Sequence, residues 1–147
     1  MKFIAHRGNI NGKIIERENT SSYIDEAFSE GYEVEIDVHY IDGEWFLGHD
    51  KPSEKISFSF LKRQGLWIHC KNIEALIQLH GEENINYFWH EEDDVALTSK
   101  GYMWVYPGKQ PIPNSIAVLP EKFEDDISQA LGVCTDYVKR YKEMWEN

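Results

Sequence analysis

The sequence predicts an α/β fold built around a parallel β-sheet, because short apolar segments alternate along the chain with segments of helical periodicity. Crossover connections between strands and helices make neighbouring strands parallel. The predicted strands are Lys2–His6, Tyr32–His39, Leu66–Cys70, Asn86–His90, Tyr102–Tyr106, Ser115–Leu119 and Gly132–Thr135. Few of them alternate cleanly between apolar and polar residues, as expected for a sheet that is buried on both faces.

Two of the predicted helices have clear start and stop signals. One begins at Thr20 or Ser21 and the other after Asn72, and each ends before a glycine. Weaker helical patterns cover residues 57–64, 93–100 and 123–131, and a terminal helix is expected over 137–145. The segment 106–115 has room only for a proline-rich loop, so one crossover helix is expected to be missing.

Length and charge limit the function classes. The chain has 147 residues, which predicts a single domain covering 1–147. Its formal net charge of -11 and the absence of a basic block make nucleic acid an unexpected partner. To bind a phosphate ligand, the protein would have to reverse this repulsive field locally with a metal ion or with a few basic side chains directed at the ligand.

The sequence gives no sign of a membrane segment. No stretch approaches the roughly 18 to 20 apolar residues that a membrane helix needs, so no membrane insertion is expected, and the N-terminus shows no signal peptide. Cys70 and Cys134 both lie in apolar runs, which favours a reducing compartment over a disulfide scaffold. We therefore expect a cytoplasmic protein.

The second predicted strand is the one that alternates cleanly. In the segment 33–39, three valine and isoleucine side chains share one face, and Glu33, Glu35, Asp37 and His39 share the other. An exposed edge strand would explain this pattern. A divalent-cation site would also explain it, because Glu35 and Asp37 can hold one hard cation through carboxylate oxygens.

Polar residues also stand at the ends of the other predicted strands. A single histidine in a strand is more often a satisfied core residue. Several polar strand ends favour a shared site, because the carboxyl ends of strands in a parallel barrel open on one face. These residues are His6, Arg7, His69, Lys71, His90, Glu91, Tyr106, Glu121 and Asp136.

Five short motifs in the first fifty residues occur in an order and spacing that resemble a known family. They are Ala5-His6-Arg7-Gly8, Glu18-Asn19-Thr20, Glu35-Ile36-Asp37, Asp42-Gly43 and Gly48-His49-Asp50. The chain resembles the glycerophosphodiester phosphodiesterases (GDPD family), within the superfamily that includes phosphatidylinositol-specific phospholipase C. Later the resemblance is limited to Lys71 and to the segment 132–137.

The resemblance implies a TIM-type (β/α) barrel. A standard barrel of this type takes about 250 residues, and this chain has 147. We therefore expect a reduced barrel of about seven parallel strands with at least one crossover helix missing, which is either distorted, incompletely closed or completed by an eighth strand.

The resemblance also implies roles for individual residues. His6 and His49 match the paired histidines that act as general base and general acid. Arg7 and Lys71 match cations that bind the phosphoryl oxygens. Glu35 and Asp37 match metal ligands, and histidine is suited to acid-base work because its ordinary pKa lies near neutrality.

Two residues are assigned less sharply by the resemblance. Glu18 could support the metal, orient His6 or simply begin the following helix. His69 stands where the family usually has an acidic third metal ligand, so it is either a ligand or a phosphate contact beside Lys71. We expect one divalent ion, Mg²⁺, Ca²⁺ or Mn²⁺, and Mn²⁺ or Zn²⁺ is favoured if His69 is a ligand.

The expected function is metal-dependent hydrolysis of a small phosphodiester, linked to glycerol or to a sugar, by a phosphoric diester hydrolase. Two alternatives stay open. The same two histidines could form a cyclic phosphate without net hydrolysis, as a phosphodiester lyase would. A catalytically degenerate barrel could instead bind a phosphate ester or a protein partner, which would need no acid-base pair.

Overall fold

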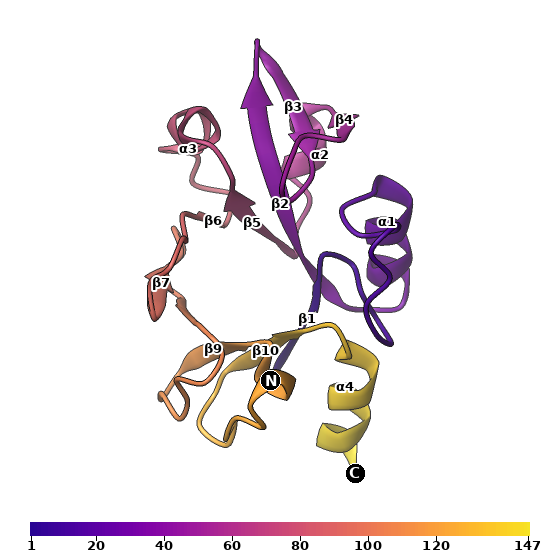
Figure 1. The fold of residues 1–147 in the computed structure, drawn as a ribbon, viewed down its shortest axis with the longest axis vertical. Coiled ribbons are helices and arrows are strands. Elements are labelled where there is room, and N and C mark those ends of the chain that lie inside the picture. Colours follow the sequence, from indigo (N-terminus) through magenta and orange to yellow (C-terminus); the bar gives the residue numbers. More distant parts are fainter.

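Ten strands form one mixed sheet that curls into a half-barrel (Figure 1). The computed structural model describes residues 1–147. The strands are β1 (Lys2–His6), β2 (Glu33–Ile41), β3 (Glu44–Leu47), β4 (Glu54–Ile56), β5 (Leu66–Cys70), β6 (Tyr87–Phe88), β7 (Val95–Leu97), β8 (Met103–Val105), β9 (Ser115–Val118) and β10 (Gly132–Thr135). The helices are α1 (Ser21–Ser29), α2 (Phe58–Leu61), α3 (Ile73–Leu79) and α4 (Val138–Glu146), with a 3₁₀ turn η1 (Pro120–Lys122).

Parallel and antiparallel pairings both occur in the sheet. The parallel part runs in the order β6-β5-β2-β1-β10-β9-β8. Strands β3 and β4 form an antiparallel extension of β2, and β7 pairs antiparallel with β8. The carboxyl ends of the parallel strands therefore meet at one end of the curl, where the polar strand ends were expected to converge.

The prediction of a reduced TIM-type barrel is wrong. Each predicted strand segment contains a strand, but the sheet has three antiparallel strands and only four short helices. Residues 93–100, expected to be helical, include β7, where burial alternates with a period of two. Residues 123–131 form no helix, and the Asp126 side chain accepts a hydrogen bond from the backbone N–H of Ser128, which favours a turn there.

The largest departure from a barrel is the hairpin of β2 and β3. Strand β2 has nine residues and continues past the end of β1, so its last residues pair with β3. Asp42 and Gly43 form the turn, with φ angles of 51° and 79°. Two positive φ angles are typical of a two-residue hairpin turn, and Asp-Gly is a preferred sequence for it.

The helix caps predicted by the sequence are confirmed. Thr20 caps α1 by accepting a hydrogen bond from the backbone N–H of Tyr23, and Asn72 caps α3 by accepting one from Ala75. Helices α1 and α4 lie along one side of the sheet, whereas no helix lies beside β7 and only the short 3₁₀ turn η1 lies near β9 (Figure 1). The regular layer of helices that a barrel would have is therefore absent from this half of the molecule.

The two faces of β2 have different surroundings. Val34, Ile36 and Val38 are fully buried in the larger hydrophobic cluster, which includes residues of α1 and α3. A second cluster fills the inside of the curl and contains Trp67 and Trp104. Because side chains alternate along a strand, Glu35 and Asp37 point to this inner side, as the sequence predicted.

No helix is both long enough and apolar enough to cross a membrane. Cys70 and Cys134 are free and buried. Burial raises the pKa of Cys70 to about 12 and raises that of Cys134 as well. Both thiols are therefore protonated near neutral pH and make poor nucleophiles.

Gly48 is required by the turn that precedes His49. Its φ is +145°, and a Cβ there would lie 2.0 Å from the carbonyl oxygen of Lys51. We expect Gly48→Ala to lower the free energy of unfolding by about 2 to 4 kcal/mol, because strain and a backbone clash add. Urea denaturation measures this loss. Gly43→Ala is the matched control, since it also has positive φ but open space around it, and an equal loss in both variants would contradict the clash.

Candidate functional site

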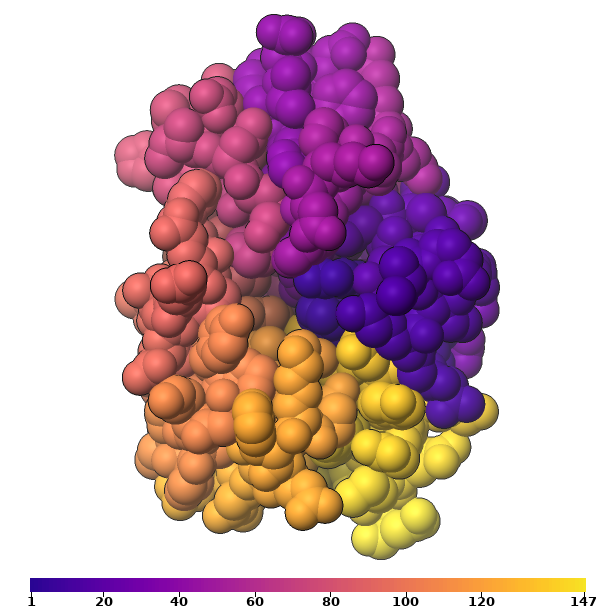
Figure 2. Space-filling model, in the orientation of Figure 1, coloured from indigo at the N-terminus to yellow at the C-terminus, as the bar shows by residue number.

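A cavity of about 480 Å³ lies at the carboxyl ends of the parallel strands. Seven of the eight predicted site residues line it: His6, Arg7, Glu35, Asp37, His49, His69 and Lys71. The remaining one, Glu18, lines a neighbouring depression together with Arg7 and His49. The space-filling view shows a hollow near the middle of the face drawn, bordered by residues from the first and the last thirds of the chain (Figure 2).

Glu35, Asp37 and His69 form the tightest cluster of possible metal ligands. One ligand atom from each residue can be chosen so that all three lie within 4.8 Å of one another. Strands β2 and β5 are parallel neighbours, and their register places Asp37 beside His69. The Nδ1 atom of His69 lies 3.1 Å from Oδ1 of Asp37. The three side chains could therefore share one cation.

The backbone of residue 90 fixes the tautomer of His69. Nε2 of His69 lies 2.9 Å from the carbonyl oxygen of His90. A carbonyl oxygen only accepts hydrogen bonds, so Nε2 carries the proton and donates it. In the neutral imidazole the lone pair is then on Nδ1, the atom that faces Asp37. This is the arrangement of a metal-ligating histidine, whose second nitrogen is held by a carbonyl or carboxylate.

Asp37 is held on one side and unpartnered on the other. Asn19 donates to Oδ2 of Asp37 at 2.9 Å and accepts from its backbone N–H at 3.0 Å, while Nε of Arg7 lies 3.3 Å from Oδ2. The buried Oδ1 atom has no hydrogen-bond partner. An unpartnered buried carboxylate oxygen that faces the free lone pair of His69 fits a bound cation.

The two buried carboxyl groups have opposite pKa shifts. Burial raises the pKa of Glu35 well above its usual range, and the nearby Asp37 raises it further. Burial also acts to raise the pKa of Asp37, but the positively charged form of His69, in which Nδ1 carries a proton and donates to Oδ1, lowers it below its usual range together with Arg7 and Asn19. Asp37 is thus ionised near neutral pH, and a divalent cation would favour ionised Glu35 as well.

His6 is paired with a carboxylate from the other end of the chain. Its Nδ1 atom lies 2.7 Å from Oδ1 of Asp136, just after β10. Burial alone would raise the pKa of Asp136, but the hydrogen bond and charge of His6 lower it. An ionised carboxylate can only accept, so Nδ1 of His6 is the donor. In neutral His6, Nε2 is then free to accept a proton, and it lies 3.9 Å from Oε1 of Glu35.

Glu18 supports this arrangement from outside the cluster of possible metal ligands. It accepts hydrogen bonds from Nη1 of Arg7 at 3.2 Å and from Nδ2 of Asn9 at 2.8 Å. Asn9 also donates to Oδ1 of Asp136 at 2.9 Å. Glu18 therefore positions Arg7 directly and His6 indirectly, through Asn9 and Asp136.

His49 has the same kind of partner as His6. Its Nδ1 atom lies 2.7 Å from Oδ1 of Asp50, and this contact lowers the pKa of Asp50. Burial lowers the pKa of His49 itself. The backbone N–H of Gly48 donates to the carbonyl oxygen of Asp37, which ties the His49 loop to β2. Two histidines with carboxylate-bound Nδ1 atoms thus line one cavity.

The two predicted phosphate-binding cations differ in their surroundings. Burial acts to lower the pKa of Arg7, but Asp37, Glu35 and Glu18 outweigh it and raise that pKa. Lys71 directly follows β5, and its backbone N–H donates to the carbonyl oxygen of Val38. Its side chain forms no ion pair and lines the cavity. Lys71 is therefore the freer of the two cations.

Sequence reasoning missed three residues that position the site. Asp136 had been noted as a strand-end residue and Asn19 as part of a family motif, both without a role in the site, and Asn9 had not been noted at all. A usable signal existed for the first two, because both belong to segments that resemble the family and lie at strand or helix ends. His90 also lines the cavity, with its ring 4.7 Å from that of Tyr106 and 6.1 Å from that of His69.

A comparison with known protein families, with curated proteins and with solved structures finds no match to this chain. The function of the protein is therefore inferred from its site and from its sequence motifs.

Proposed function

We propose that this protein is a metal-dependent phosphodiesterase of the glycerophosphodiester phosphodiesterase type, which hydrolyses a small phosphodiester. One observation carries the proposal. Two histidines with carboxylate-bound Nδ1 atoms and a possible three-residue metal site line the same cavity, although they come from segments far apart in the sequence. A protein that only binds phosphate esters would need no such pair of histidines.

The residues at the possible metal site fit a divalent ion. Glu35, Asp37 and His69 would hold it, with His69 acting through Nδ1. Such an ion would act as a Lewis acid on a phosphoryl oxygen. Imidazole is a poor ligand for Mg²⁺ and Ca²⁺ but a good one for Mn²⁺ and Zn²⁺, so we expect Mn²⁺ or Zn²⁺ to be preferred.

His6 is proposed as the general base. Its Nε2 atom removes the proton from the water that attacks phosphorus, while Asp136 holds Nδ1 and stabilises the imidazolium that forms. As the new P–O bond forms, the bond from phosphorus to the alcohol of the substrate breaks. Asp136, Asn9 and Glu18 are positioning residues in this scheme, because they act on His6 and Arg7 rather than on the substrate.

His49 is proposed as the general acid that gives a proton to the departing alkoxide. Asp50 holds its Nδ1 atom, so the proton is delivered from Nε2. Lys71 and Arg7 provide positive charge for the phosphoryl oxygens. If a hydroxyl group of the substrate replaced water as the nucleophile, the same groups would form a cyclic phosphate, and product analysis separates the two reactions.

The cellular setting is also a proposal. Two unpaired, buried cysteines are what a reducing compartment such as the cytoplasm would permit. The acidic charge of the chain is consistent with a small diester rather than a nucleic acid as the ligand.

An assay with bis(p-nitrophenyl) phosphate and glycerophosphodiesters tests the function. We expect no turnover after treatment with EDTA and recovery with added metal, with Mn²⁺ or Zn²⁺ more effective than Mg²⁺ at equal concentration. Phosphate products are followed by phosphorus NMR, which distinguishes monoesters from cyclic esters. Equal turnover with and without EDTA would contradict the metal-dependent mechanism, and no turnover with any metal or diester would leave only a binding function.

A further inference from the structure

We propose that the substrate carries a second anionic group, which Lys13 and Lys122 bind at the side of the cavity away from Lys71. The inference rests on the proposed phosphodiesterase function and narrows its substrate class. The group would be a carboxylate or a phosphate on the alcohol part of the diester, a few bonds from the phosphorus that reacts.

The charge balance of the cavity differs from that of the chain. The cavity wall carries four basic and four acidic side chains, counting only Lys, Arg, Asp and Glu, in a chain with a net charge of -11. A divalent ion at the possible metal site would make this wall positive by two charges. A phosphodiester has one negative charge, so it would neutralise only half of that excess, and one further negative charge would complete the balance.

The positive charges of the wall are not equally available to a ligand. Arg7 is held by Glu18 and Asp37. Like most lysines of this chain, Lys13, Lys71 and Lys122 form no ion pair, and they are the lysines that line the cavity. These three ammonium groups are therefore free to bind an anion without first breaking an existing pair.

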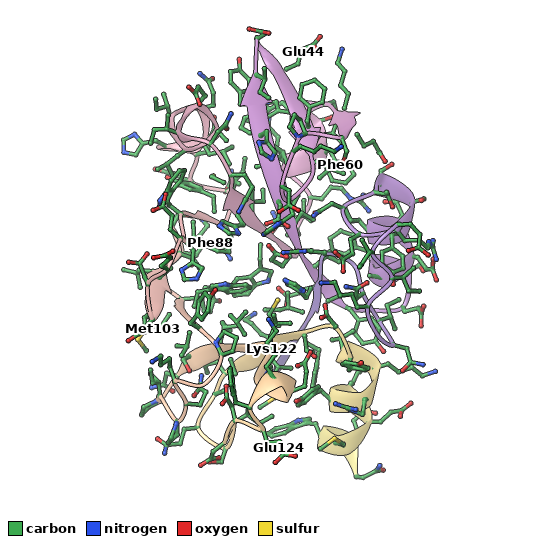
Figure 3. The ribbon with its side chains drawn as sticks, viewed as in Figure 1. Glu44, Phe60, Phe88, Met103, Lys122 and Glu124 are labelled. Atoms are coloured by element: carbon green, nitrogen blue, oxygen red, sulfur yellow. The ribbon has the colours of Figure 1, made fainter.

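The free lysines approach the cavity from different walls. Lys71 directly follows β5, two residues after His69, whereas Lys122 belongs to η1 after β9 and Lys13 to the connection between β1 and α1. Four strand spacings separate β5 from β9 along the curled sheet, which is about 19 Å at the usual spacing. Lys122 lies on the side of the ribbon that faces the middle of the molecule (Figure 3). With Lys71 at the reacting phosphate, Lys13 and Lys122 are left for a second group.

The size of the cavity agrees with a ligand larger than a phosphate. Its volume of about 480 Å³ lies within the range of about 300 to 1,000 Å³ that is usual for small-molecule sites. Neutral glycerol or methyl groups would leave Lys13 and Lys122 without a counter-charge. A phosphodiester of glycerate or of a phosphorylated polyol would place a negative charge in the same space.

Calorimetric titration of the whole protein, with Mn²⁺ bound, tests the inference with two product-like probes. 3-Phosphoglycerate and glycerol 3-phosphate share a skeleton and differ in one carboxylate. We expect the wild type to bind 3-phosphoglycerate about tenfold more tightly, since two exposed ion pairs each contribute up to about fivefold. The double variant Lys13→Gln/Lys122→Gln should lose this preference and keep its affinity for glycerol 3-phosphate. The control variant Lys62→Gln/Lys139→Gln removes the same charge from two exposed lysines outside this cavity. It should keep the preference for 3-phosphoglycerate.

Three outcomes would overturn the inference. The first is equal affinity of the wild type for both probes, and the second is a preference for 3-phosphoglycerate that survives in the Lys13→Gln/Lys122→Gln variant. The third is a preference that EDTA abolishes in the wild type, because the metal alone would then account for it. The titration needs no turnover, so it is independent of the diester assay. Hydrolysis without this preference would remove the second-anion site and leave the proposed function intact. The preference without hydrolysis would support the second-anion site and contradict the proposed function.

Discussion

Replacing His6 with alanine is expected to lower kcat for phosphodiester hydrolysis by about 10²- to 10⁴-fold, and His49→Ala should do the same, since each variant lacks one proton-transfer group. The pairing of each Nδ1 atom with a carboxylate is the reason to expect a large effect. Asp136 and Asp50 leave Nε2 as the reactive atom of each histidine. The measurement is steady-state kinetics with the diester and metal that give the highest wild-type turnover.

The fold of each variant must be checked separately, because His6 is buried and also holds Asp136. Thermal unfolding followed by circular dichroism serves this purpose. His6→Gln is the second variant, since its amide can donate to Asp136 but cannot remove a proton near neutral pH. His80→Ala is the matched control, because His80 is exposed at the end of α3 and lies outside the cavity. A His6→Gln or His49→Ala protein that keeps near wild-type kcat would refute the proposed acid-base roles.

Local patterns in the sequence were sufficient to place the inner face of the sheet. The alternation in β2 put Glu35 and Asp37 on the side opposite to Val34 and Ile36, and the structure has this arrangement. The same alternation applies to β5, where His69 lies beside Asp37 on the inner face. The prediction works because the side chains of a strand alternate whatever the strand is paired with.

The overall architecture could not be obtained in the same way. The sequence does not show which segments become crossover helices, and residues 93–100 include the strand β7 although their apolar spacing also suits a helix. The hairpin of β2 and β3 was a readable signal, because Asp42-Gly43 stands between two apolar strands. These residues were assigned only to a family motif, and the antiparallel part of the sheet was missed.

Contacts between distant residues were the hardest part of the site to predict. His6 and Asp136 are 130 positions apart in the sequence. A short sequence motif contains no information about which distant residue each of them contacts. The sequence showed only that both end a strand. The pairing follows from the direct parallel contact of β1 with β10, which brings the two strand ends together.

Glu35→Gln separates the effect of the metal from that of the fold. Glu35 is buried beside ionised Asp37, and its pKa is raised by burial and then by Asp37, so the neutral amide should cost the metal-free protein little or stabilise it. Asp37 is unsuitable for this test, because its removal would also leave Asn19 without its hydrogen-bond acceptor and Arg7 without one of its ion-pair partners. We expect Glu35→Gln to weaken Mn²⁺ binding by about 100-fold or more, since it removes a direct ligand.

Thermal unfolding with and without Mn²⁺ measures the result. At a metal concentration of 100 times Kd the wild type should gain about 2.7 kcal/mol, which corresponds to a rise in Tm of about 5 to 10 °C for a domain of this size. Glu35→Gln should lose this rise while its Tm in EDTA equals or exceeds that of the wild type. Glu33→Gln makes the same change on the same strand, next to Trp67 and outside the cavity, and should retain the full rise. If Glu35→Gln keeps the rise, the ion binds elsewhere, and the assignment of Glu35, Asp37 and His69 as its ligands is wrong.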